Sequence, residues 1–337
     1  MYNSLLKKYA KKLLPHRRDF YLRMLFGRTS QKSLSRLLVD LGLKEGAVVL
    51  VHCAFSQLGY FPKGAVGLIK SIQEIVGVGG TIAMPAFSSS DSMQSFLSKP
   101  QDFDVMHTPS KVGYLSETFR TFKDVHRSIH PTHSICALGK YAKELVEGHQ
   151  LSETPCGANS PFARLGSMNA VLLRIGTGSL PLRHHTQELV GFPNQFISEK
   201  ATIPCKNRSG KEILVHTRVY RKQIPNILFL GDDTPSQLFS IHPKDFPLLF
   251  SGDREDVLRK DPKRQQVLND LRSIRTMFIE NGSLRMGEIN GCRCELFDVK
   301  DFIVYAVREQ KRLISKYRNK YSLNNLRLLL ESGNYPG

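Results

Sequence analysis

Residues 47–85 read AVVLVHCAFSQLGYFPKGAVGLIKSIQEIVGVGGTIAMP, and they carry the clearest fold signal in the chain. The first five residues are a short apolar run, typical of a strand buried on both faces of a sheet. A loop over 52–64, a helix over 65–76 and a glycine-rich turn follow, and a second buried strand over 81–84 ends at Pro85. This order is that of a βαβ unit in an α/β sheet, whose functional loops gather beyond the strand ends.

Elements of the same two kinds are predicted on both sides of this unit. An amphipathic helix over 31–41 precedes it, with leucines on one face and Gly42 as its stop signal. The strongest strand signal covers 170–176 and leads directly into a segment over 177–188 that contains glycine and histidine. Since no Pro/Ser/Gly-rich linker divides the chain, we predict one α/β domain. Further helices are expected over 113–122, 140–147 and 298–317, and further strands over 135–138 and 212–220.

The predicted organisation has three parts: a basic N-terminal arm over 1–28, the α/β domain over 29–307, and a basic C-terminal helical tail over 308–337. Within the domain, a highly charged segment at about 235–275 is expected to be an irregular insert. The boundaries follow the shifts in charge and in periodicity along the chain.

Net charge is concentrated at the two ends of the chain. The 337 residues hold 48 Lys and Arg against 30 Asp and Glu, a formal net charge of +18, and eight of these basic residues stand against one Asp in residues 1–30. Leu5, Leu6, Tyr9 and Leu13 have helical spacing beside four lysines, which fits a helix on an anionic membrane surface and equally a helix docked on its own domain or on a second subunit. We therefore keep peripheral membrane association and a homo-oligomer as possibilities. No zinc finger or RNP-type motif is present, so no nucleic-acid partner is expected.

The composition excludes several classes of protein. Hydrophobic residues make up 41% of the chain, yet no apolar run approaches the roughly 18 to 20 residues that span a bilayer. A signal peptide is not recognised, so we predict a cytoplasmic protein, with the peripheral association above as an option. The six cysteines are scattered, and Cys292 and Cys294 are too close for a zinc-binding CxxC pair. Reduced thiols in or near strands are the prediction.

One candidate catalytic pair, His185 and Glu188, follows the strand over 170–176. Helix positions three apart share a face, so the imidazole and the carboxylate can converge on one substrate group. A neutral imidazole, with an ordinary pKa of about 6.5, is suited to remove a proton from an attacking nucleophile at physiological pH. The spacing alone also fits two polar residues at a solvated helix end, so both interpretations stay open on the residues themselves.

Three histidines, His126, His130 and His133, suggest a metal-dependent hydrolase as an alternative. Pro131 breaks the helix that would bring the three rings onto one face, so we expect a turn and no metal site. Other catalytic motifs are missing, namely the GxxxxGK[ST] phosphate loop, GxGxxG and GxSxG. Cys53 follows a strand, but a thiol alone is not a catalytic pair.

Several segments in the same order resemble the aminoglycoside 3-N-acetyltransferase family, enzymes that move an acetyl group from acetyl-CoA to an amine of an amino sugar. Each segment is short, and the ordered set over roughly residues 30–190 is what makes the resemblance specific, with a weaker echo over 287–302. The matching segments are VHCAFSQLGY (51–60), GGTIAMPAFS (79–88), TPSKVG (108–113), ETFR (117–120), RSIHP (127–131), Ser160-Pro161, LLRIG (172–176) and HTQE (185–188).

The resemblance implies a three-layer α/β/α fold with a mixed central sheet. It also implies that His185 is the general base that deprotonates the acceptor amine and that Glu188 orients or binds the amine-bearing substrate. Acetyl-CoA would be the co-substrate, lying along two loops. The residues expected to bind it are His52, Cys53 and Ser56 in the first loop and Thr108, Ser110 and Gly113 in the second.

The acceptor itself is left open between two kinds of amino sugar. Aminoglycosides are polycations, and their sites favour acidic walls. Because this chain is basic, an anionic acceptor such as a nucleotide-linked sugar or a surface-glycan precursor fits at least as well. A second hypothesis from another class is a non-catalytic protein whose basic arm docks on membrane while the α/β body binds a partner.

Overall fold

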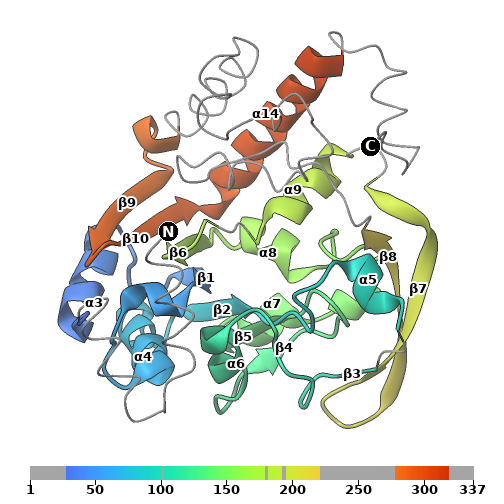
Figure 1. Ribbon diagram of the computed structural model, residues 1–337, viewed down its shortest axis with the longest axis horizontal. Coiled ribbons are helices and arrows are strands. Elements are labelled where there is room, and N and C mark those ends of the chain that lie inside the picture. The colour runs from blue at the N-terminus through green and yellow to red at the C-terminus, as the bar shows by residue number, and fades with distance from the viewer. Residues whose placement is uncertain (1–27, 100–101, 179–180, 192–194, 221–277, 319–337) are drawn as a thin grey trace, which may run out of the picture.

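The computed structural model describes residues 28–99, 102–178, 181–191, 195–220 and 278–318 (Figure 1). The basic arm before Arg28, the predicted insert at 235–275 and the tail beyond residue 318 lie outside these described residues. Two sheets organise the rest, one of seven strands in the order β4-β5-β2-β1-β6-β10-β9 and one of three strands in the order β3-β7-β8.

The centre of the large sheet is parallel and its flanks are antiparallel. β1 pairs in parallel with both β2 and β6, so that Leu50 lies beside Ala83 on one side and Leu172 on the other. β5 runs antiparallel to β2, and β10 runs antiparallel to β6. The strands are β1 (Val48–Cys53), β2 (Thr81–Pro85), β4 (His126–Arg127), β5 (Ile135–Gly139), β6 (Val171–Ile175), β9 (Leu284–Ile289) and β10 (Cys292–Asp298).

Helices cover both faces of this sheet. Along β1, Val49 and Val51 belong to the hydrophobic cluster beneath α3, α4 and α6, whereas Val48 and Leu50 belong to the cluster beneath α7, α8 and α14. Successive strand residues point to opposite faces, so the sheet is the middle of three layers. Complete burial of a leucine such as Leu50 contributes about 2 kcal/mol. The helices are α3 (Gln31–Asp40), α4 (Gly64–Val76), α6 (Tyr114–Arg120), α7 (Ala142–Val146), α8 (Pro161–Ser167) and α14 (Val299–Arg318).

Local sequence sets where the helices begin and end. Ser30 caps α3, its hydroxyl accepting a hydrogen bond from the Ser33 N–H, and Ser160 caps α8 in the same way with Pro161 at the first helical position. Such a side-chain cap satisfies a backbone donor that the helix leaves unpaired. At the end of α4, Gly77 has a φ of 62°, a conformation that glycine adopts without strain.

The small sheet stands beside the large one and is built from β3 (Phe103–Asp104), β7 (Phe196–Lys206) and β8 (Glu212–Tyr220). Its strand β8 is attached to the loop between the short helix η2 (His149–Leu151) and α8, because the Arg218 N–H donates to the Glu153 carbonyl at 2.9 Å. This contact brings the end of β8, with Tyr220, next to the large sheet. The remaining short elements are η1 (Phe55–Leu58) and α5 (Met93–Leu97).

The mixed three-layer α/β/α architecture expected from the sequence is confirmed. The predicted strand, helix and strand within residues 47–85 are β1, α4 and β2. The predicted helix over 298–317 is α14, which passes through the predicted boundary between residues 307 and 308. All six cysteines are free thiols, as expected. None of the described helices is long and apolar enough to cross a lipid bilayer.

Candidate active site

Three loops meet at the carboxyl edge of the parallel strands. The loop after β1 touches the start of α6, because the rings of Phe55 and Tyr114 pack edge to face with centroids 5.7 Å apart. It also touches the end of β6, where a Cβ added to Gly176 would lie 2.5 Å from the Cβ of Gln57. Ligands of open α/β sheets bind at this edge. The site therefore begins where the βαβ pattern predicts it.

His185 lies on helix α9 (Arg183–Val190), which follows β6 and ends at Gly191 in a left-handed conformation. The side chain is 5% exposed. Its ring Nδ1 lies 2.7 Å from the Cys156 carbonyl oxygen. Since a carbonyl only accepts, Nδ1 carries the hydrogen, and the neutral ring has its lone pair on Nε2. Among the described residues, no hydrogen-bond partner faces Nε2.

Burial lowers the pKa of His185 below its ordinary value of 6.5, and the bond to the Cys156 carbonyl opposes this effect. Burial penalises the imidazolium, because a charged ring loses more hydration than a neutral one. The ring is therefore neutral at physiological pH. A neutral ring with a free Nε2 lone pair is what a general base requires.

Glu188 lies one turn further along α9, and its carboxylate accepts three hydrogen bonds from the protein. Oε1 accepts from the Cys156 N–H at 3.1 Å and from the Tyr220 hydroxyl, and Oε2 accepts from the Thr154 hydroxyl. Burial raises the pKa of Glu188 above its ordinary value, and these hydrogen bonds oppose the rise without cancelling it. The carboxylate thus faces protein donors on three sides.

His185 and Glu188 both bond to the backbone of one residue, Cys156. The Cys156 carbonyl accepts from His185, and the Cys156 N–H donates to Glu188. The sequence predicts that ring and carboxylate converge on a substrate group; in the structure both hold the segment 154–156. The next residue, Gly157, has no Cβ, and one would overlap the Thr154 hydroxyl. A larger residue at position 157 would therefore displace the Thr154 side chain that bonds to Glu188.

A cluster of histidine rings lies behind this pair. His130 stacks on His149 with centroids 4.6 Å apart, and His133 packs edge to face against Tyr220 at 5.4 Å. Burial lowers the pKa of His133 to about 3 and that of His149 to about 4, so all three rings are neutral. His126 lies apart from them on β4. Among the described residues no group of three His, Cys, Asp or Glu side chains is placed to hold a metal ion.

The residues expected to bind CoA lie at the end of β1, in η1 and in the segment between β3 and α6. His52 and Cys53 end β1, and Ser56 is exposed on η1. Burial and the charge of Arg174 lower the pKa of His52 to about 4, while burial raises the pKa of the Cys53 thiol well above 9. Cys53 is thus a protonated thiol and a poor nucleophile.

The second loop is held in place by arginines. The buried Arg127 donates to the carbonyls of Thr108 and Ala86, and Arg120 pairs with Glu117, which accepts from the Ser110 N–H at 2.6 Å. Gly113 lies at the start of α6 with a φ of 128°. These contacts bring the predicted loop residues Thr108, Ser110 and Gly113 onto the same edge as β2.

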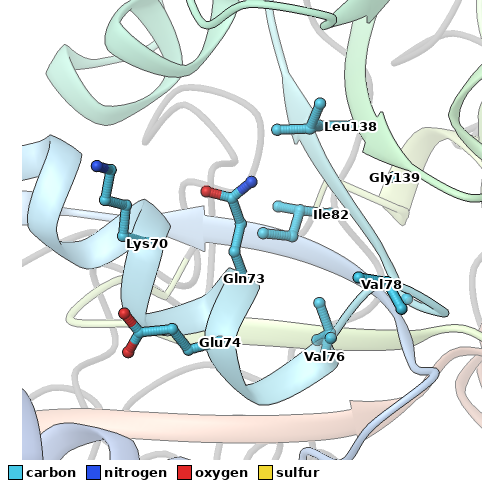
Figure 2. A pocket seen from close by; sticks show the side chains of 10 residues that line it. Lys70, Gln73, Glu74, Val76, Val78, Ile82, Leu138 and Gly139 are labelled. Carbon is cyan, nitrogen blue, oxygen red and sulfur yellow. The ribbon is translucent and has the colours of Figure 1, made fainter.

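Two open cavities lie at the opposite, amino edge of the sheet. One, of about 520 Å³, is bordered by Lys70, Gln73 and Glu74 of α4 and by Ile82 and Leu138 on neighbouring strands (Figure 2). The other, of about 620 Å³, lies between the starts of β1 and β6 and the end of β10. Neither contains a residue that the sequence predicts to be functional.

A model of the family described as aminoglycoside 3-N-acetyltransferase matches residues 50–310, most of the chain and both loops and helix α9 of the site. The chain belongs to this family. Curated relatives include the SPbeta prophage-derived aminoglycoside N(3')-acetyltransferase-like protein YokD of Bacillus subtilis, 33% identical over 45% of this chain and 61% of the relative. Aminoglycoside N(3)-acetyltransferase IX of Micromonospora chalcea is 30% identical over 48% of this chain and 63% of the relative. The chain thus spans about three fifths of these aminoglycoside 3-N-acetyltransferase relatives.

Solved structures of aminoglycoside acetyltransferases share the fold. AAC(3)-Xa superposes with a TM-score of 0.66 at 22% identity, covering 87% of this chain and 97% of that one. AAC-IIIb, solved as a binary complex with CoASH, superposes with a TM-score of 0.62 at 21% identity, covering 88% of this chain and 98% of that one. At such identity the likeness establishes the architecture of the 3-N-acetyltransferase fold.

Within this aminoglycoside 3-N-acetyltransferase fold, sequence reasoning missed the residues that hold His185 and Glu188, the candidate pair. Thr154, Cys156 and Tyr220 lie about 30 residues from their partners in the chain, on a loop and on β8. Helical spacing relates positions on one helix and carries no information about such distant partners. The nearest signal was the run of histidines, which marks the buried cluster around Tyr220.

Proposed function

We propose that this chain is an acetyl-CoA-dependent N-acetyltransferase that acetylates an amine of an amino sugar. The observation that carries the proposal is the His185 ring, which is neutral, fixed by Nδ1 on the Cys156 carbonyl, and has no partner for Nε2 in the part of the chain that the structure describes. Membership of the family and the position of the ring at the carboxyl edge support the same activity.

The chemistry follows from the proton on the acceptor. An alkylammonium cannot attack a thioester, so His185 Nε2 first accepts one proton from nitrogen. The amine then forms a bond to the thioester carbonyl carbon, and the carbon–sulfur bond breaks as the carbonyl re-forms. The imidazolium of His185 returns its proton to the departing sulfur, and the second amine proton leaves to solvent. Backbone N–H groups at loop and helix starts on this edge would stabilise the oxyanion.

The two loops at this edge suit a CoA molecule. Three buried polar atoms there have no hydrogen-bond partner among the described residues: His52 Nδ1, Ser88 Oγ and Ser110 Oγ. Buried polar groups are nearly always paired, so these atoms mark a region that a ligand or water completes. Since AAC-IIIb binds CoASH on the same fold, we assign His52, Cys53, Ser56, Thr108, Ser110 and Gly113 to the binding of CoA.

Charges near the catalytic pair favour an anionic acceptor. The positive charge of Arg218 lowers the pKa of Glu188, and that of Arg183 lowers the pKa of His184 and of the Cys156 thiol. The Glu188 carboxylate already accepts three hydrogen bonds, which reduces its capacity to bind an ammonium group. AAC-VIa, a structural relative, binds sisomicin. For this chain we propose an amino sugar that carries an anionic group, such as a nucleotide-linked sugar or a surface-glycan precursor.

A direct assay tests the activity and the acceptor class together. The purified protein is mixed with acetyl-CoA and with three acceptors in turn, an aminoglycoside, a nucleotide-linked amino sugar and a neutral amino sugar, and released CoA is measured with a thiol reagent. Release that is fastest with the nucleotide-linked sugar supports the proposal, and release that is fastest with the aminoglycoside contradicts the anionic acceptor.

Calorimetric titration with CoA separates the enzyme from the non-catalytic alternative. CoA binding is expected for the enzyme. If CoA does not bind, and the protein instead pellets with anionic liposomes at high salt in a manner that requires residues 1–28, the non-catalytic membrane-docking hypothesis replaces the proposal.

A further inference from the structure

Tyr220 is a buried tyrosine at the catalytic pair to which the mechanism above gives no role. It ends β8, on the small sheet, and is 3% exposed. Its ring stacks between His184, with centroids 4.6 Å apart, and Phe196, with centroids 5.0 Å apart. This packing fixes the plane of the ring and therefore the direction of its hydroxyl.

The hydroxyl is a permanent donor. Burial raises the pKa of Tyr220 well above its ordinary value of 10, so the O–H stays protonated at any pH at which the protein works. It donates to Glu188 Oε1, the same oxygen that accepts from the Cys156 N–H. Two donors from separate segments thus converge on one oxygen atom.

These contacts form a continuous path to the base. Tyr220 holds Glu188, Glu188 holds the Cys156 N–H, and the carbonyl of the same residue, Cys156, holds His185 Nδ1. Hydrogen bonds to a charged group are shorter and about twice as strong as neutral ones. The Cys156 N–H and carbonyl belong to the two planar peptides on either side of its Cα. Glu188 also accepts from the Thr154 hydroxyl, so its carboxylate fixes the segment 154–156 that in turn orients the His185 ring.

We propose that Tyr220 is a positioning residue for the acetyl transfer: its hydroxyl fixes the Glu188 carboxylate, and through the backbone of segment 154–156 it keeps Nε2 of His185 aimed at the acceptor nitrogen. The expected effect on kcat rests on the proposed function. The effect on the orientation of the His185 ring depends only on the contacts among Tyr220, Glu188, Cys156 and His185. Strand β8 is thereby a component of the catalytic apparatus, although it lies outside the central sheet.

The test is Tyr220→Phe, which keeps the stacked ring and removes the hydroxyl. Loss of one hydrogen bond to a carboxylate, worth about 1.5–3 kcal/mol, corresponds to a fall in kcat of about 10- to 150-fold. KM for acetyl-CoA is expected to stay within about twofold of wild type, because the CoA loops are untouched. Tyr141→Phe is the matched control, since Tyr141 borders the cavity at the amino edge.

A double-mutant cycle shows whether Tyr220 acts through Glu188. In a Glu188→Ala background, adding Tyr220→Phe should change kcat by less than about twofold, because the acceptor to which the hydroxyl donates is gone. If the two effects multiply, Tyr220 acts by another route and the proposal is wrong. An unchanged kcat in Tyr220→Phe alone also overturns it.

A spectroscopic measurement gives an outcome that needs no turnover. In long-range ¹H–¹⁵N spectra at neutral pH, wild-type His185 should show a protonated Nδ1 and an unprotonated Nε2, with His185→Gln used to assign the signals. In Tyr220→Phe the two nitrogen shifts should move toward each other as the tautomers mix. Mixing in a protein that acetylates nothing would support the positioning role and refute the proposed function. Unmixed signals in Tyr220→Phe, in a protein that does acetylate an amino sugar, would support the proposed function and refute the positioning role.

Discussion

The two edges of the seven-stranded sheet differ in their cavities and in their buried polar side chains. The amino edge holds open cavities of about 520 and 620 Å³, bordered by side chains such as Lys70 and Gln73 that meet solvent. The carboxyl edge holds the His185 pair and the buried histidines, and three of its buried polar atoms, His52 Nδ1, Ser88 Oγ and Ser110 Oγ, have no hydrogen-bond partner among the described residues. Among the described residues, the candidate site at the carboxyl edge is thus marked by buried polar contacts, whereas the two cavities at the amino edge contain no predicted site residue.

Acid should act first and most strongly on the carboxyl edge. His133 and His149 have folded-state pKa values of about 3 and about 4, below the unfolded value of 6.5. Below pH 6.5 the unfolded chain therefore binds more protons than the folded one, and the free energy of unfolding decreases as the pH is lowered. Two such shifts lower the free energy of unfolding by roughly 8 kcal/mol between pH 7 and 3, comparable with the total stability of a domain. Circular dichroism at stepped pH should show unfolding between about pH 6 and 4.

His216→Gln is the control for this acid transition. His216 is exposed on β8 and bonds to the Thr202 hydroxyl, so its replacement should leave the midpoint unchanged. A free energy of unfolding that is flat between pH 7 and 5 would show that the buried histidines do not set the stability of this edge.

The next largest effect is expected for His185→Ala. Removal of a general base typically costs about 10²–10⁴ in rate, and we expect kcat/KM to fall about 10³-fold. Affinity for CoA should persist, because the assigned CoA loops are not altered, and calorimetric titration measures it. A rate within tenfold of wild type would remove the ring from its role and leave the carboxyl edge without a base.

Arg127→Met should show a smaller, mixed effect. The guanidinium donates to Thr108 and Ala86 carbonyls and to the Ser134 hydroxyl, so its loss leaves buried acceptors unpaired. We expect about 3 kcal/mol of lost stability, seen in urea unfolding, and a KM for acetyl-CoA about tenfold higher. An unchanged KM in the folded variant would show that the arginine supports the fold without shaping the CoA loop.

The smallest effect is expected at the amino edge. Lys70→Ala and Val78→Ser change side chains that border the smaller cavity, and Val78 is 97% exposed. Surface changes of this kind usually alter stability by less than about 0.5 kcal/mol, and kcat/KM should stay within about twofold. A large loss of activity in steady-state assays of either variant would show that the amino edge also contributes to activity.

The sequence predicts the layers of this fold well because their signals are local. The apolar run over 47–51 and the helix over 65–76 depend on neighbours a few residues apart, and both occur where expected. The position of His185 also follows from a local rule, that loops after buried strands form the functional edge.

The contacts that make the site work are not local. The carbonyl of Cys156 fixes His185 across 29 positions, and Tyr220 reaches Glu188 across 32. The two-residue strands β3 and β4 are too short to leave a periodic signal, and they exist because longer strands pair with them. Tertiary packing supplies these features.

The order of strands in the large sheet has a consequence for synthesis. β6 is completed at Ile175, yet its antiparallel neighbour β10 starts at Cys292, about 120 residues later. At 5–20 residues per second, one edge of this largely apolar strand stays uncovered on the ribosome for on the order of 10 s. Nascent chains that stop short of β10 should therefore bind chaperones and aggregate.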